Sequence, residues 1–255
     1  MISLLGNISL DLEPSPHAGG GPYHGARALY RLRVPARIVA RCAIGDKALL
    51  LPPLVRLGTP VRYVEGAATT TFAFHYEGDR RIMRIEAIGD TWQPDDLPPL
   101  PPSVSWVHVA PLARDEFPAA TLAALARRYR VSFDGQGLVR VPEVGPLRLD
   151  DAYDPELLRH LRVLKLAEEE AEAVGDVTKL QVPEVIVTRG SRGSTVYVGG
   201  RSEDVPAHAL DVDPTGAGDA FMTAYVVARS TGLTPVGAAR RATAVVASVL
   251  AQGPW

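Results

Sequence analysis

The most informative segment of the sequence is Asp213-Pro214-Thr215-Gly216-Ala217-Gly218-Asp219-Ala220-Phe221. Its two glycines flank an alanine, Ala217, near which a helix is predicted to start. The start of a helix offers unpaired N–H groups and the positive end of the helix dipole, and glycine has no Cβ to keep an anion away. The segment therefore predicts an anion cradle. Asp219 falls in the first turn, where its carboxylate either matches the dipole or acts as a base beside a bound phosphate.

From spacing alone, a plain turn explains this segment equally well. The whole string, however, resembles the phosphotransferase signature of the ribokinase or PfkB family of carbohydrate kinases. That signature is close to Asp-Thr-Thr-Gly-Ala-Gly-Asp, and Pro214 replaces its first threonine. The resemblance implies that Asp219 is the catalytic base. It also implies that the amides of Gly216, Ala217 and Gly218 hold the charge that develops on the transferred phosphoryl group.

Composition narrows the class of protein. The chain has 255 residues, 46% of them hydrophobic, which is enough for one α/β domain over residues 1–255. Its formal charge of −2 predicts neither a nucleic-acid partner nor a membrane-surface partner. Cys42 is the only cysteine, so an internal disulfide is excluded and a reducing, cytoplasmic location is expected. The N-terminus lacks a signal-peptide pattern, and no apolar run approaches the roughly 20 residues of a membrane helix.

The hydrophobic pattern indicates the architecture. Short runs rich in Val and Ile alternate with segments of helical period, which predicts a doubly wound, mostly parallel sheet flanked by helices. The first strand is expected at Ile2–Leu10. Residues 69–85 break the alternation with two strands joined by Glu77-Gly78-Asp79, a hairpin turn signal. This hairpin is either a plain edge hairpin or a small β lid, and the family resemblance, which implies the ribokinase-like fold, favours the lid.

Residues for the phosphate acceptor are expected near the N-terminus. Asp11 is predicted at the carboxyl end of the first strand, where open α/β sheets bind ligands and a carboxylate can accept hydrogen bonds from two hydroxyls. The stretch from Gly19 to Leu32 resembles the N-terminal signature of the family, with His24 where an asparagine usually stands. The resemblance implies substrate-binding roles for Asp11, Gly20, Gly21 and His24.

Residues for a metal and a nucleotide are expected further along the chain. The segment Ala167–Glu170 resembles the Asn-x-x-Glu metal motif of the family, with Ala167 at the Asn position. Mg²⁺ takes oxygen ligands and keeps several waters, so we expect Glu170 and Asp134 to hold it through water. The string from Thr188 to Gly193 resembles the nucleotide loop of the family. The implied ATP-binding residues are Thr188, Gly190, Gly193, Thr215 and Thr243. A monovalent cation such as K⁺ around Asp213 and Thr215 is left open.

Taken together, the sequence predicts an ATP-dependent kinase that phosphorylates a hydroxyl of a sugar, polyol or nucleoside, as a monomer or homodimer. A ligand-binding or regulatory protein with little turnover is the alternative, because Ala167 and His24 replace asparagines of the family pattern. A kinase of phosphorylated sugars would need basic residues in the acceptor pocket, for which Arg27, Arg81 and Arg140 are candidates. No Walker A lysine, zinc-binding His pair or nucleophile elbow is found in the sequence.

Overall fold

A computed structural model describes residues 1–77, 80–207 and 214–251. Gly78 and Asp79 of the predicted hairpin turn lie outside the described residues, as does Asp213, the first residue of the glycine-rich motif and part of the predicted cation site.

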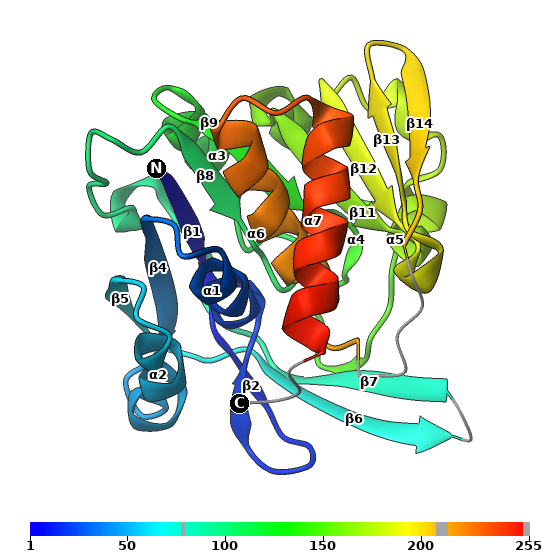
Figure 1. The fold of residues 1–255 in the computed structure, drawn as a ribbon. Coiled ribbons are helices and arrows are strands. Elements are labelled where there is room, and N and C mark those ends of the chain that lie inside the picture. The colour runs from blue at the N-terminus through cyan, green and yellow to red at the C-terminus, as the bar shows by residue number, and fades with distance from the viewer. Residues whose placement is uncertain (78–79, 208–213, 252–255) are drawn as a thin grey trace.

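The centre of the molecule is a mixed sheet whose strands are mostly parallel (Figure 1). In the described residues its order is β14 (Arg201–Val205), β13 (Ser194–Val198), β12 (Glu184–Thr188), β11 (Val163–Ala167), β9 (Arg130–Asp134), β8 (Trp106–Val109), β1 (Ile2–Asn7), β4 (Ala36–Ala43) and β5 (Val61–Gly66). In this spatial order, each strand from β12 across to β5 is parallel to its neighbours in that run. At the other edge β13 pairs antiparallel with β12, and β14 pairs antiparallel with β13. The predicted doubly wound α/β fold is confirmed.

Helices cover both faces of this sheet. On one face α1 (Gly21–Leu32), α6 (Ala217–Ser230) and α7 (Pro235–Leu250) pack side by side, as Figure 1 shows. Their apolar residues meet alternate residues of the strands, such as Leu4, whereas the next residue, Leu5, faces the core below α3 (Ala119–Ala126) and α5 (Glu168–Val174). This period of two is typical of a strand buried on both faces. The remaining helical segments are α2 (Lys47–Arg56), α4 (Gln136–Val139) and the 3₁₀ turns Pro94–Asp96, Pro155–His160, Val177–Lys179 and Gly190–Arg192.

A second sheet lies below the carboxyl ends of the central strands (Figure 1). Its order is β10 (Gly145–Pro146), β7 (Arg80–Ala87), β6 (Thr71–Glu77), β2 (Ser9–Asp11) and β3 (His17–Gly19). The predicted hairpin is present as β6 and β7, but the sheet also recruits three short strands from elsewhere in the chain. Phe72, Ile85 and Leu112 form a small apolar core beneath it.

The predicted first strand is in fact two strands. β1 ends at Asn7, and the N–H of Ile8 donates to the carbonyl of Arg41 at 2.9 Å, after which the N–H of Leu10 donates to Thr70 at 2.9 Å. The chain therefore leaves the central sheet at Ile8 and enters the second sheet. The prediction that Asp11 ends a central strand is wrong, because Asp11 lies in β2 of the second sheet.

A buried ionic network fixes helix α6 to the sheet. The Glu184 carboxylate, which is fully buried at the start of β12, accepts hydrogen bonds from Tyr225 at 2.8 Å and from Arg229 at 2.7 and 3.0 Å. Charge-assisted, two-pronged bonds of this kind have well-defined geometry. They hold the axis of α6 in a fixed orientation, and with it the helix N-terminus. No described helix combines the length and apolar character that crossing a bilayer requires.

Candidate active site

The N-terminus of α6 is built around Gly216. Its φ of 76° lies in the left-handed region that favours glycine, and a Cβ placed on it would lie only 2.1 Å from Nδ1 of His24. The His24 ring, which is buried, therefore packs directly on the backbone of the motif. Of the three predicted cradle amides, the N–H of Ala217 already donates to the carbonyl of Pro214 at 2.9 Å. The glycine pattern is thus required by a close approach of two chain segments.

Asp219 is buried and faces the start of α1. A Cβ built on Gly21 would lie 2.2 Å from Cβ of Ala110 and 3.1 Å from Oδ1 of Asp219, so Ala110 requires a glycine here and the carboxylate lies close to the backbone of Gly21. Burial raises the pKa of Asp219 to about 7, and the nearby Asp134 adds to the rise, whereas Lys165 and Arg140 oppose it. The structure thus brings together the predicted base and the predicted acceptor loop. It also gives the carboxyl a pKa suited to proton transfer near neutral pH.

The other predicted acceptor residues lie beside this point. Gly20 precedes α1 and accepts the N–H of His24 at 3.1 Å. Asp11 accepts a hydrogen bond from Ser9 at 2.8 Å, and its Oδ2 would lie 2.4 Å from a Cβ on Gly19. Asp11 therefore reaches the glycine loop from the second sheet, although its strand is not the one predicted.

A buried cluster of charges lies at the carboxyl ends of β9 and β11. Nζ of Lys165 is 3.2 Å from both carboxylate oxygens of Asp134 and 3.9 Å from Oε2 of Glu170. Burial lowers the pKa of Lys165, but the carboxylates of Asp134, Glu170 and Asp219 outweigh burial and raise it above its ordinary value. Burial raises the pKa of Glu170. A Cβ on Gly218 would lie 3.1 Å from Nζ, so the ammonium lies against the first turn of α6.

The same cluster bears on the predicted magnesium site. Oε2 of Glu170 accepts the N–H of Ala167 at 2.7 Å, and Asp134 is fully buried against Lys165. Among the described residues, no group of three or more His, Cys, Asp or Glu side chains could hold a metal ion. These carboxylates therefore do not fit direct coordination of a metal, and their contact with Mg²⁺ through water stays a prediction. Sequence reasoning gave Lys165 no role; the available signal was a lysine inside the apolar strand Val163–Ala167.

The predicted nucleotide residues are spread over three elements. Thr188 ends β12 opposite Ala167, and its hydroxyl donates to the carbonyl of Leu166 at 3.3 Å. Gly190 and Gly193 bound the 3₁₀ turn between β12 and β13. Thr215 is half-buried just before α6, and the hydroxyl of Thr243 donates to Ala239 within α7 at 3.0 Å. Thr188 thus shares an edge of the sheet with the charge cluster, since β12 runs beside β11.

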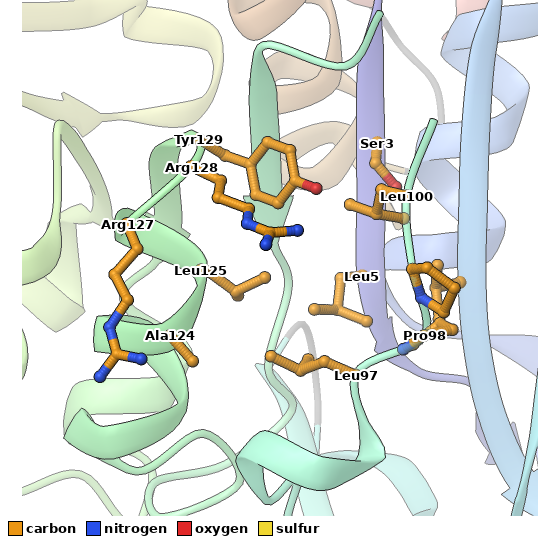
Figure 2. A pocket seen from close by; sticks show the side chains of 12 residues that line it. Ser3, Leu5, Leu97, Pro98, Leu100, Ala124, Leu125, Arg127, Arg128 and Tyr129 are labelled. Atoms are coloured by element: carbon orange, nitrogen blue, oxygen red, sulfur yellow. The ribbon is translucent and has the colours of Figure 1, made fainter. Parts of the chain in front are cut away.

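A cavity of about 300 Å³ lies elsewhere, on the α3 face of the sheet (Figure 2). Leu5, Leu97 and Leu125 line it, and the guanidinium of Arg128 and the ring of Tyr129 lie at its upper side in the view. It contains none of the predicted site residues. We therefore place the candidate active site at the N-terminus of α6 and not in this cavity.

Comparisons with known proteins show which chains this one resembles. The family model described as pfkB family carbohydrate kinase matches residues 17–253. A curated inositol 3-kinase of Zea mays is 32% identical over 194 residues, which are 74% of this chain and 50% of that protein. Its counterpart in Oryza sativa subsp. japonica is 30% identical over 73% of this chain and 49% of that protein. The chain thus spans about half the length of the curated relatives it matches.

Solved structures share the fold. A pyrophosphate-dependent kinase in the ribokinase family, complexed with a pyrophosphate analog and myo-inositol, superposes with a TM-score of 0.84 at 24% identity, covering 98% of this chain and 95% of that chain. The nucleoside kinase of Burkholderia thailandensis in complex with inosine gives 0.76 at 20% identity, covering 100% and 92%. The ribokinase of Thermotoga maritima gives 0.71 at 20% identity, covering 98% and 91%. At these identities the likeness establishes the fold.

Proposed function

The chain belongs to the pfkB family of carbohydrate kinases, and on that premise we propose that it transfers a phosphoryl group to a hydroxyl of a polyol or sugar. One observation carries the proposal: a buried carboxyl with a pKa near 7, Asp219, faces the glycine loop at Gly21 from the first turn of α6. A base in the first turn of a helix, close to the backbone of a glycine loop, suits the activation of an alcohol next to an anion.

In the proposed reaction Asp219 accepts the proton of the acceptor hydroxyl while that oxygen attacks the phosphorus of the donor in line. The bond from this phosphorus to the bridging oxygen breaks, and ADP leaves if the donor is ATP, or phosphate if it is pyrophosphate. The N-terminus of α6 faces the transferred group, and its dipole offsets the charge that spreads over the phosphoryl oxygens. Catalysis of this kind consists mainly of positioning and electrostatics. The bonds of Glu184 to Tyr225 and Arg229 support it by fixing the helix in place.

For the acceptor we propose a cyclic polyol, with myo-inositol as the first candidate. The curated relatives are named inositol 3-kinases, and one structural neighbour was solved with myo-inositol. In this chain Asp11 approaches the glycine loop and can accept hydrogen bonds from two adjacent hydroxyls. Gly20 and Gly21 would let the ring approach the backbone, and His24 would border the acceptor beside Gly216.

For the donor we propose ATP, bound by backbone atoms of the turn at Gly190 and Gly193 and by Thr188, Thr215 and Thr243. Pyrophosphate is a second candidate, because three structural neighbours are described as pyrophosphate-dependent kinases. A Mg²⁺ ion on the donor phosphates would neutralise part of their charge. The proposed location is cytoplasmic, and monomer and homodimer both remain compatible with the fold.

A panel of acceptors and donors tests the proposed function. Purified protein is incubated with myo-inositol, ribose, fructose or inosine, each with ATP or pyrophosphate, and products are followed by ³¹P NMR. We expect a new phosphate monoester of myo-inositol that appears with one donor in preference to the other. If an acceptor raises the melting temperature but no monoester forms with either donor, the chain is a ligand-binding protein and the proposal fails.

The pH dependence of kcat/KM tests the base separately. Because the pKa of Asp219 is raised to about 7, the carboxylate form, which alone accepts a proton, prevails above that pH. We therefore expect kcat/KM to fall about tenfold per pH unit below pH 7 and to level off above it. The control is the stability of the protein over the same range, followed by circular dichroism. A rate that stays level down to about pH 5, near the ordinary range of an aspartate, would contradict a raised pKa at the base.

A further inference from the structure

Lys165 lies at the centre of the charged cluster. Its side chain is 4% exposed, its Nζ contacts both oxygens of Asp134, and Oε2 of Glu170 is 3.9 Å away. On its other side the ammonium faces Gly218, one residue before Asp219. Lysine is seldom buried unless it is paired. Here one ammonium pairs with carboxylates from β9 and α5 and lies against the first turn of α6. It therefore connects these three elements, whose facing ends we call the floor of the site.

The two carboxylates beside Lys165 already have hydrogen-bond and ion-pair partners. Asp134 is fully buried, and its Oδ1 also accepts the N–H of Gln136 at 3.3 Å. Glu170 closes the first turn of α5 through the N–H of Ala167. A divalent ion bound directly to either carboxylate would lie within a few ångströms of a buried ammonium, where like charges repel strongly because little water screens them. The position that carboxylates would otherwise give to a metal is thus occupied by a side chain.

We propose that the ammonium of Lys165 is a built-in cation of the active site: it neutralises Asp134 and Glu170 beneath the tip of α6, so that a divalent ion takes no direct ligand from these carboxylates and is bound directly by the phosphates of the donor. The inference rests on the proposed kinase function for its role in catalysis. Its statement about metal binding stands on the geometry of the cluster.

The charge balance of the floor supports this role. The groups that face one another there are the carboxylates of Asp134, Glu170 and Asp219 and the cations of Lys165 and Arg140. If Lys165 were absent, these three acidic groups would lie close together in a buried place, with Arg140 as their nearby cation. Lys165 is therefore a positioning residue, which holds Asp134 and Glu170 in place and lessens the negative field at Asp219.

Mn²⁺ binding to the protein alone provides the test, because it requires no turnover. Electron paramagnetic resonance detects free Mn²⁺, and we expect the parent protein without donor to leave that signal unchanged. The variant Lys165→Met uncovers Asp134 and Glu170, so we expect it to acquire a saturable Mn²⁺ site, and Asp134→Asn in the same background to remove it. Lys179→Met is the matched control, since Lys179 is 81% exposed and pairs with Asp176 on the surface.

Each outcome decides the inference. The inference is overturned if the parent protein binds Mn²⁺ saturably and Glu170→Gln abolishes that binding. Both proteins in this measurement keep Lys165, so it does not depend on whether Lys165→Met folds. A folded Lys165→Met that gains no Mn²⁺ site would overturn it as well.

In the acceptor assay we expect Lys165→Met to lose about 10- to 100-fold in kcat and Lys165→Arg to recover part of the loss. The acid limb of the rate profile should move to higher pH in Lys165→Met, whereas a purely structural defect would leave its midpoint in place. If no acceptor is phosphorylated at all, the proposed function fails and the Mn²⁺ result still stands.

Discussion

Asp219→Asn should reduce kcat about 1,000-fold, the middle of the range that a general base contributes. Asparagine keeps the shape of the side chain but cannot take the proton of the acceptor hydroxyl. Steady-state rates with the acceptor found in the panel give kcat. Thermal shifts with donor and acceptor, measured on the same variant, should match those of the parent, since the substitution leaves the binding contacts intact.

The stability of Asp219→Asn separates loss of chemistry from loss of fold. The substitution removes a buried carboxyl whose charge is opposed by burial and by Asp134, so we expect the melting temperature not to fall. Asp176→Asn is the matched control, because Asp176 caps an exposed turn through Thr178 and pairs with Lys179 on the surface, and its kcat should equal that of the parent. A kcat for Asp219→Asn within tenfold of the parent would eliminate Asp219 as the base.

Gly216→Ala should lower kcat about 100-fold, the order expected when a catalytic group shifts by an ångström. The new methyl group would lie 2.1 Å from Nδ1 of His24, and the φ of 76° costs an alanine about 1–2 kcal/mol. The tip of α6 and the His24 ring must therefore move apart, which displaces both the helix N-terminus and the acceptor loop. Rates and melting temperature are measured together.

Gly232→Ala is the control for backbone strain alone. Gly232 has a φ of 94°, but a Cβ there would meet no atom within 4 Å, and the residue lies beyond the far end of α6. Gly216→Ala should lose more stability than Gly232→Ala, because it adds the clash with His24 to the strain, and only Gly216→Ala should lose turnover. The double variant Gly216→Ala with His24→Ala, which removes the ring, should recover part of the rate. Equal rates for the two glycine variants would show that the tip of α6 takes no part in catalysis.

Much of the fold could be predicted because the strands of a parallel sheet are buried on both faces and form short apolar runs. α6 begins at Ala217, where the sequence predicts the start of a helix. β10 could not be predicted, since it consists of Gly145 and Pro146, which have no strand pattern of their own. The division of the first strand after Ile8 was missed for a similar reason, because it depends on a change of partner from Arg41 to Thr70, both far away in sequence.

The site was predictable only where its residues are close in sequence. Gly216, Gly218 and Asp219 belong to one motif, and the structure adds that Gly21 faces the carboxylate. Lys165 could not be assigned a role from the sequence, because the meaning of a lysine in an apolar strand depends on its partner. That partner, Asp134, comes from another strand, 31 residues earlier in the chain.

The short strand β10 also has a mechanical consequence. Gly145 pairs with Ile85 of β7, and the N–H of Leu147 donates to Met83 at 2.9 Å, so the second sheet is attached to the segment that follows α4. That segment folds back on itself through Arg140 and Leu149, and Arg140 is close enough to Asp219 to influence its charge. If β7 moves when an acceptor binds, the segment that carries Arg140 would move with it, beside the proposed base. Such a linkage would make phosphoryl transfer wait for the alcohol and would suppress wasteful hydrolysis of the donor by water.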